Sequence, residues 1–523
     1  MRILSHERGN PDTEVGRSLS RRGLRELQTS PEQSEVGASS LLAKQSQSPL
    51  GSRIGHSTQR AGKPSTRGRA RRKPVAHKGN MCRIGQAGKS MRTSLWGIAN
   101  KSRNAPDHRF TDLFGLLNAE GLTWCWRDLN KKACSGVDGV IARVYAEHLD
   151  QNIAQLAVRV REKRYKARLV KRRHIPKDEG DGKRPLGIPV LEDRLLQLTA
   201  ARILEAIYDP VFSPYSWAYR PHRGAHEAVR TLTRKLQFGR YGYVVEIDIK
   251  AFFDNINHGL LLKMLEKRIA DRSFLRLIRK WLKAGVLEED GKVRHPLTGC
   301  PQGGCISPIL ANIYLHTALD EWFQNTVQPW CKGWAYMCRY ADDVVFAFQS
   351  RDEAEAFFRT LPKRLGRFGL ELSEAKSQIV RFSRFYVGRV ARSFDFLGFE
   401  FRWIPDRGGT PRVTRRTSRK RLRRSLARVK EWIRSRRSEP VRYLMRILKR
   451  KLRGCYNYYG VRGNSRSLWS FYVEAIRIVL KWLNRRSHRR SYNWTQYKAL
   501  LRRFGIPKPR IMEGRIQMEL GYA

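Results

Sequence analysis

The chain contains the stretch Glu246-Ile-Asp-Ile-Lys-Ala-Phe-Phe-Asp254 and, further along, Tyr340-Ala-Asp-Asp343. Apolar, β-branched runs precede Asp248 and follow Asp343, and such runs predict strands. Two adjacent aspartates in the turn of a β-hairpin lie within reach of a third carboxylate on the neighbouring strand. Two Mg²⁺ ions need hard oxygen ligands of this kind while a hydroxyl attacks a phosphate. We therefore predict a catalytic two-metal site at Asp248, Asp342 and Asp343.

An isolated Ala-Asp-Asp is more often a polar turn between two strands. The composition favours the catalytic interpretation, because 104 Lys and Arg against 47 Asp and Glu give a net charge of +57 in 523 residues. Such an excess indicates a polyanionic partner, RNA or DNA. No apolar run approaches the roughly 18 residues of a membrane span. The eight cysteines form no Cys-x-x-Cys pair, which favours a reduced compartment without structural zinc.

The length predicts about two to four domains. Residues 1–80 are rich in Ser, Arg, Gly and Pro and predict a disordered basic tail, with Met81 as an alternative start. Residues 81–165 predict a helical amino-terminal extension, including a helix from about Ala142 to Arg161. Residues 166–405 alternate strands and helices, which predicts an α+β palm with fingers.

The remaining segment, residues 406–523, predicts an all-α basic domain. Between residues 411 and 455, 19 of 45 residues are Lys or Arg and only two are acidic. Apolar residues recur there at helical spacing, which predicts two amphipathic helices with basic outer faces suited to a nucleic-acid duplex. A merely solvated basic face is the alternative. The candidate RNA-binding residues are Arg415, Arg416, Arg419, Lys420, Arg423 and Arg424.

Several blocks along residues 95–520 resemble the group II intron reverse transcriptase–maturase family. The resemblance rests on motifs in the family's order, which are Gly136-Val-Asp-Gly139, Arg184-Pro-Leu-Gly-Ile-Pro189, Phe212-Ser-Pro-Tyr-Ser-Trp-Ala-Tyr-Arg-Pro221, Pro301-Gln-Gly-Gly304, Phe394-Asp-Phe-Leu-Gly-Phe399 and Leu452-Arg-Gly-Cys-Tyr-Asn-Tyr-Tyr459. It implies a right-hand polymerase of fingers and palm, followed by a thumb/maturase domain. Many relatives also carry a carboxy-terminal endonuclease, whose motifs we do not find and expect to be lacking.

The resemblance also implies roles for single residues. Lys177 and Arg184 would contact the incoming triphosphate, and Gln302 would lie beside the nascent pair. Phe253 would select dNTPs by excluding a 2′-hydroxyl. Lys376 would lie near the leaving pyrophosphate. Gly398 would allow the primer grip to approach the primer strand, while Glu246 and Asp254 are nearby acids that we do not expect to bind metal.

The function implied is an RNA-directed DNA polymerase that also binds intron RNA to assist splicing and supports retromobility. Its expected partners are group II intron RNA, an RNA template with a DNA primer, dNTPs and target DNA, and no membrane. The alternatives are an RNA-binding maturase without polymerase activity, or a retron or diversity-generating type of reverse transcriptase. The bacterial cytoplasm is the expected location, because we find no convincing transit peptide.

Overall fold

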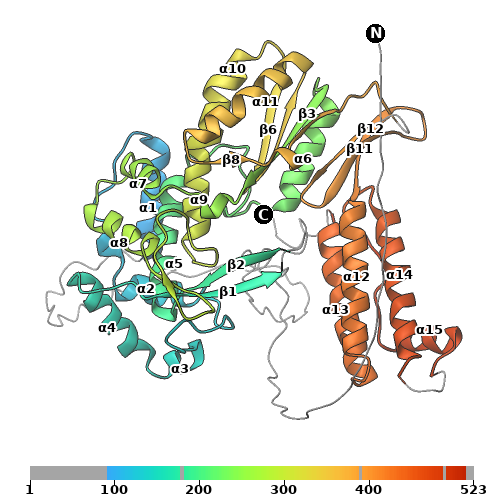
Figure 1. Ribbon diagram of the computed structural model, residues 1–523, viewed down its shortest axis with the longest axis horizontal. Helices are drawn as coiled ribbons and strands as arrows, with labels where there is room; N and C mark the ends of the chain where they lie inside the picture. Colours follow the sequence, from blue (N-terminus) through green and yellow to red (C-terminus); the bar gives the residue numbers. More distant parts are fainter. Residues whose placement is uncertain (1–90, 177–181, 388–391, 487–490, 514–523) are drawn as a thin grey trace, which may run out of the picture. The chain divides into compact units, whose positions relative to one another are not determined.

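The computed structural model describes residues 91–176, 182–387, 392–486 and 491–513, and all of these belong to one compact unit. Two predictions lie outside the described residues, namely the tail at 1–80 and the position of Lys177. The described chain mixes helices and sheets, which confirms the α+β class (Figure 1). No helix of the described ranges combines the length and apolar character that crossing a bilayer would need.

Helices dominate the first part of the described chain. They are α1 (Met91–Asn104), η2 (Phe114–Leu116), α2 (Ala119–Trp126), α3 (Ala142–Glu147), α4 (Leu149–Arg161) and α5 (Leu191–Tyr208). The single helix predicted from Ala142 to Arg161 is divided, because His148 has a non-helical backbone with φ −127° and ψ 45°. Helix α5 is buried along most of its length and joins these helices to the central sheet through one core.

A small sheet with the strand order β2-β1-β4-β5 follows. Its strands are β1 (Val170–Pro176), β2 (Lys183–Ile188), β4 (Val286–Leu287) and β5 (Val293–Arg294). Strands β1 and β2 form an antiparallel hairpin in which Ile175 lies opposite Arg184. The alternation of strands and helices predicted for residues 166–405 thus begins with a strand.

The central sheet has the order β6-β7-β3-β8, with β9 also pairing with β3. Its strands are β3 (Tyr243–Lys250), β6 (Ala335–Tyr340), β7 (Asp343–Phe348), β8 (Glu371–Leu372) and β9 (Gln378–Arg381). Alternate residues of β3 and β7 enter two different cores: Val245 and Phe346 enter one, and Val244 and Val345 the other. The sheet is therefore covered on both faces, which explains its nearly continuous apolar strands.

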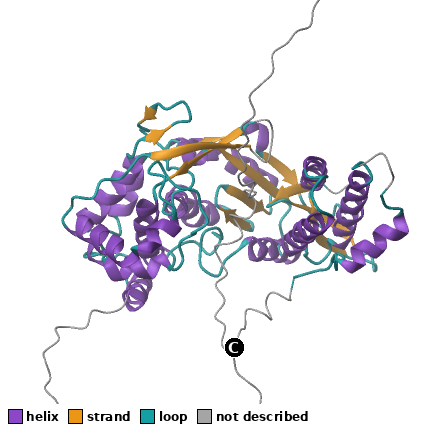
Figure 2. Ribbon diagram, turned by 90° about the horizontal axis from the view of Figure 1, so that it is seen from below, coloured by secondary structure: helices purple, strands orange, loops and turns teal. Residues whose placement is uncertain are grey.

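The helices of this central region are α6 (Ala225–Phe238), α7 (His258–Glu266), α8 (Arg272–Leu282), α9 (Ser307–Leu315), α10 (Gln328–Trp330) and α11 (Arg351–Gly366). Short helical turns are η3 (Phe252–Asp254) and η6 (Glu374–Lys376), and two π-helical segments follow α9, namely η4 (His316–Asp320) and η5 (Phe323–Val327). In Figure 2 the strands lie between groups of helices.

A three-stranded antiparallel sheet leads into the carboxy-terminal helices. Its strands are β10 (Ser393–Phe396), β11 (Phe399–Pro405) and β12 (Pro411–Thr417). The helices are α12 (Arg419–Ser435), α13 (Val441–Tyr459), α14 (Ser465–Leu483) and α15 (Trp494–Arg503), and they share one apolar core. Helices α12, α13 and α14 stand side by side in Figure 1. The two predicted amphipathic helices are thus present as α12 and α13.

Candidate active site

The three predicted aspartates gather at one end of the central sheet. Asp248 of β3 lies directly opposite Asp343 of β7 in the antiparallel register, so both side chains emerge on the same face. Strands β6 and β7 form a hairpin in which Tyr340 pairs with Asp343, leaving Ala341 and Asp342 as a two-residue turn. The predicted hairpin and its relation to the strand of Asp248 are therefore confirmed, while the metal-binding role of the three aspartates stays a prediction.

The turn requires an unusual backbone. Ala341 has φ 57°, in the left-handed region that glycine normally occupies at the first position of such a turn. For a residue with a Cβ this conformation costs about 1–3 kcal/mol. Surrounding contacts must therefore hold the residue that precedes Asp342.

Electrostatics at Asp342 favour a cation. Burial raises the pKa of Asp342 above its ordinary value, and the negative charge of Asp248 raises it further. Arg184 and Arg339 act in the opposite direction. A carboxylate whose proton affinity is raised by burial and by a neighbouring negative charge is stabilised when a bound cation compensates that charge.

A divalent metal ion fits this donor set, because carboxylate oxygens are its preferred ligands. Among the described residues, no three His, Cys, Asp or Glu side chains converge closely enough to hold a metal ion by themselves. A protein cation already occupies one carboxylate: Lys376 Nζ lies 3.0 Å from Asp248 Oδ2. Asp248, Asp342 and Asp343 would hold the metal, and Lys376 would have to yield to it.

Phe253 lies on η3, the short turn that follows β3, five residues after Asp248. Its side chain is half-buried and packs edge-on against Phe252, with ring centroids 5.2 Å apart. Its carbonyl accepts a hydrogen bond of 2.8 Å from the Cys300 amide, and the Ile256 carbonyl accepts one from Gly299. The loop before Gln302 is thereby attached to the segment that carries Phe253.

The same loop also contacts strand β2. The Gly187 amide donates to the Gln302 carbonyl at 2.6 Å. A Cβ on Gly303 would lie 2.4 Å from the Gly187 carbonyl oxygen, so only glycine allows this approach. Arg184, on the same strand, is exposed, and its charge acts on Asp342. The structure thus places the Gln302 loop against the strand that carries Arg184, and the charge of Arg184 acts on Asp342.

Gly398 occupies a tight turn between β10 and β11. Leu397 and Gly398 both have positive φ, 51° and 77°, as a type I′ turn requires. A Cβ on Gly398 would lie 2.9 Å from the Tyr459 hydroxyl, and Tyr458 donates a hydrogen bond of 3.0 Å to the Leu397 carbonyl. Gly398 therefore admits a tyrosine of α13, and its approach to a primer strand stays a prediction.

The six candidate RNA-binding residues have different environments. Arg415 is buried and forms an ion pair with Glu513, and its guanidinium also bonds the Thr233 hydroxyl. Arg416 forms a two-point ion pair with Glu400 at 2.9 and 2.8 Å. Both cations make contacts within the protein, and their contact with RNA stays a prediction. The remaining four lie on α12, namely Arg419, Lys420, Arg423 and Arg424.

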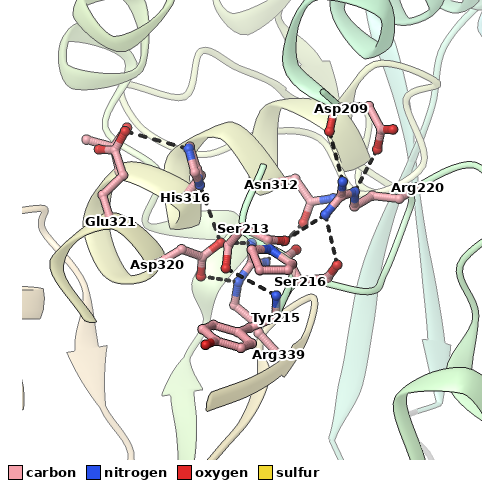
Figure 3. Close-up of polar contacts among 12 residues, drawn as sticks. Asp209, Ser213, Tyr215, Ser216, Arg220, Asn312, His316, Asp320, Glu321 and Arg339 are labelled. Atoms are coloured by element: carbon pink, nitrogen blue, oxygen red, sulfur yellow. Dashed lines mark hydrogen bonds and ion pairs between the residues drawn. The ribbon is translucent and has the colours of Figure 1, made fainter. Parts of the chain in front are cut away.

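Sequence reasoning missed a buried polar network behind the aspartate turn, drawn in Figure 3. Arg339 of β6 is fully buried, and its guanidinium bonds Asp320, Asn312 and the Ala341 carbonyl. The signal was present, because Arg339 interrupts the apolar strand Tyr336-Met-Cys338 two residues before the turn. A charge inside an otherwise buried strand requires a partner.

Residues 175–401 match the family model described as reverse transcriptase (RNA-dependent DNA polymerase). The group II intron-encoded protein LtrA of Lactococcus lactis subsp. cremoris is 36% identical over 220 residues, which cover 42% of this chain and 36% of LtrA. This chain therefore contains a reverse transcriptase domain and is similar to group II intron-encoded proteins. A reverse transcriptase domain implies a fingers–palm polymerase fold, and the mixed helices and sheets of residues 175–401 are consistent with it.

Two further relatives extend the comparison. Protein YkfC of Escherichia coli K12 is 36% identical over 241 residues, covering 40% of this chain and 62% of YkfC. Nuclear intron maturase 2 of Arabidopsis thaliana is 28% identical over 176 residues, covering 26% of this chain and 24% of that protein. The chain thus spans between about a quarter and three fifths of the length of these relatives. Reverse transcriptases generally use divalent metal ions, which agrees with the donor set at Asp248 and Asp342.

Proposed function

We propose that this protein is an RNA-directed DNA polymerase that extends a DNA primer with dNTPs on an RNA template. The pairing of Asp248 with Asp343 across β3 and β7, beside the turn that carries Asp342, is the observation that carries the proposal. We propose two Mg²⁺ ions, which would activate the primer hydroxyl and neutralise the charge that develops on the phosphates.

The protein's own residues then have distinct roles. Arg184 and Lys177 hold the triphosphate by charge-assisted hydrogen bonds. Phe253 fills the space beneath the sugar and excludes a 2′-hydroxyl. Gln302 lies beside the nascent base pair on a loop that Gly187 and Phe253 anchor. Lys376, paired with Asp248 before substrate binds, moves to stabilise the departing pyrophosphate.

Primer extension on an RNA template tests this function, with the full chain, Mg²⁺ and an Asp342→Ala control. Extension by the wild type alone is the expected result. If the wild type binds template and primer but extends nothing in Mg²⁺ or Mn²⁺, polymerase activity is excluded.

A second function, binding of intron RNA to assist splicing, is favoured by the exposed cations of α12 and by a relative named as an intron maturase. In this proposal residues 406–523 form the thumb/maturase domain, residues 81–165 the amino-terminal extension and residues 166–405 the fingers and palm. Retromobility into target DNA would combine both activities. The bacterial cytoplasm remains our predicted location, and LtrA and YkfC are proteins of bacteria.

A further inference from the structure

The buried network of Figure 3 contacts two left-handed turns through the carbonyls of Ala341 and Ala218. One is the turn at Ala341, with φ 57°, and the other is at Tyr219, with φ 56°. Neither residue is glycine, and each such backbone costs about 1–3 kcal/mol unless its surroundings impose it. The negative charge of Asp342 acts on the Tyr219 hydroxyl, as does the positive charge of Arg184. The side chains at the two turns therefore lie near enough to interact electrostatically.

Arg339 holds the first turn. Its Nη1 donates to the Ala341 carbonyl at 3.2 Å and to Asn312 Oδ1 at 3.0 Å. Its Nε and Nη2 bind the two carboxylate oxygens of Asp320 at 2.7 and 2.5 Å. This planar fork fixes the orientation of the guanidinium, and hence the position of the carbonyl that precedes Asp342.

Asn312 holds the second turn through the same guanidinium. Its Oδ1 accepts from Arg339, while its Nδ2 donates to the Ala218 carbonyl at 2.7 Å, immediately before Tyr219. The backbone of Arg339 adds two bonds to this segment: its carbonyl accepts from Trp217, and its amide donates to Tyr215, both at 2.9 Å. Asn312 is 1% exposed, so water does not compete for these bonds.

Asp320 completes the network from a π-helical segment, η4, that widens the helix after α9. Burial alone would raise the pKa of Asp320, but Arg339 and His316 hold it below its ordinary value, so the carboxylate is charged. His316 Nδ1 lies 3.6 Å from Asp320, and His316 Nε2 lies 3.6 Å from Glu321. The buried charges of Arg339 and Asp320 thus compensate each other.

Stability alone does not account for this arrangement. Replacing a buried ion pair by apolar residues of similar volume is often neutral or stabilising, because two charges no longer need to be desolvated. The Arg339–Asp320 pair therefore has to be explained by the geometry that it imposes. The pair contacts the turn of Asp342 through the hydrogen bond from Arg339 to the Ala341 carbonyl. Asn312 connects it to the other turn by donating to the Ala218 carbonyl.

We propose that Arg339, Asn312 and Asp320 are positioning residues that fix the Asp342 turn and the Tyr219 turn relative to each other. This inference rests on the proposed polymerase function, and all three residues act through the turns and not on the substrate itself. It predicts that loss of the network lowers the rate of the chemical step and leaves nucleotide binding almost unchanged, because a small misplacement of a reacting group reduces rate steeply.

The decisive variant replaces both partners, Arg339→Met with Asp320→Leu, so that neither charge of the pair remains buried alone. We expect it to melt within about 3 °C of the wild type. We expect kcat for primer extension to fall about 10- to 100-fold, with KM for dNTP changed less than about threefold. A folded double variant with wild-type kcat, or one altered only in KM, would overturn the proposal.

Two more variants provide a second test and a control. In Arg339→Lys the ammonium group can still pair with Asp320, but it cannot also bond Asn312 and the Ala341 carbonyl. We therefore expect kcat of this conservative variant to stay below that of the wild type. Wild-type kcat in this variant would overturn the proposal even if the double variant does not fold. The matched control is Arg364→Met, because Arg364 donates two bonds of 2.9 Å to the Thr317 and Ala318 carbonyls of the same η4 segment. We expect it to leave kcat unchanged.

Hydrogen exchange separates this inference from the polymerase function. Amides at residues 340–343 and at 217–221 should exchange faster in the double variant and not in Arg364→Met, whether or not the wild type extends primers. Unchanged exchange at both turns would refute the positioning role directly. Faster exchange with an inactive wild type would refute the proposed function and leave the positioning role standing.

Discussion

Lys376 and Asp248 form an ion pair at 3.0 Å in which the ammonium group bonds the carboxylate that we assign to metal binding. The backbone supports this geometry, because the Ser373 amide donates to the Asp248 carbonyl and the Asp248 amide to the Ser377 hydroxyl. The loop that carries Lys376 is therefore attached to β3 on both sides of the lysine.

Lys376→Met should strengthen metal binding in the absence of nucleotide, because the ammonium group no longer competes for Asp248. Both groups are partly exposed, so we expect a modest gain, roughly two- to fivefold in affinity. Mn²⁺ binding followed by electron paramagnetic resonance measures it. Lys250→Met is the matched control, since Lys250 forms a similar exposed pair with Glu371. Equal shifts in the two variants would contradict the competition.

Asp342→Ala should reduce polymerisation on the order of a thousand-fold, because metal ions contribute several kcal/mol to such reactions. Binding of intron RNA and splicing assistance should persist, since the exposed cations of α12 are unaffected. Primer extension and a splicing assay with the same preparation measure both effects. Loss of splicing in a folded variant would mean that the two functions share this site.

Phe253→Ala should admit ribonucleotides, because in our proposal the half-buried ring occupies the space beneath the sugar, and alanine would leave that space empty. We expect discrimination between dNTP and rNTP, measured as the ratio of kcat/KM values, to fall about 10- to 100-fold. Phe253→Tyr retains the bulk of the ring and should retain the discrimination. An unchanged ratio in Phe253→Ala would assign selection of the sugar to another residue.

Glu246 provides a prediction for pH. Burial raises its pKa from 4.5 to about 7, although Gln378 and the Asp395 amide bond its carboxylate. Because the pKa is higher in the folded state, Glu246 contributes most to stability below its ordinary pKa and loses that contribution as the pH rises to about 7. The melting temperature of Glu246→Gln, relative to that of the wild type, should therefore rise as the pH increases from 4.5 to about 7. Above this pH the difference between the two melting temperatures should stay constant. A difference independent of pH would contradict the shift.

Cations of α12 and β12 should respond differently to substitution. Arg419 and Arg423 are exposed, so Arg419→Glu and Arg423→Glu should weaken RNA binding. The slope of the logarithm of the binding constant against the logarithm of the salt concentration should become shallower by about 0.7–0.9 for each phosphate that the protein no longer neutralises. Arg416→Gln should instead lower the melting temperature, since Arg416 pairs with Glu400, and leave the slope unchanged. Filter binding at several salt concentrations distinguishes them. If Arg416→Gln changed the slope as much as the substitutions at Arg419 and Arg423 do, Arg416 would be shown to contact RNA.

Local patterns predicted the elements that carry the site. Apolar runs that end in aspartates predicted β3 and the β6–β7 hairpin, because side-chain alternation and turn chemistry are properties of short segments. The same holds for α12 and α13, whose apolar residues recur at helical spacing. The break at His148 was not predicted, because apolar spacing alone does not report one non-helical residue.

The sequence by itself identified the carboxylates that we predict to bind metal, the strands that carry them and the basic character of the chain. Only the tertiary structure decided which cationic side chains are buried and paired with carboxylates inside the protein. Arg415 looks like its neighbours in sequence, yet it pairs with Glu513, and Arg339 pairs with Asp320 and reaches Asn312. Whether a cation faces solvent or a buried carboxylate depends on contacts between segments far apart in the chain, and local sequence does not encode these.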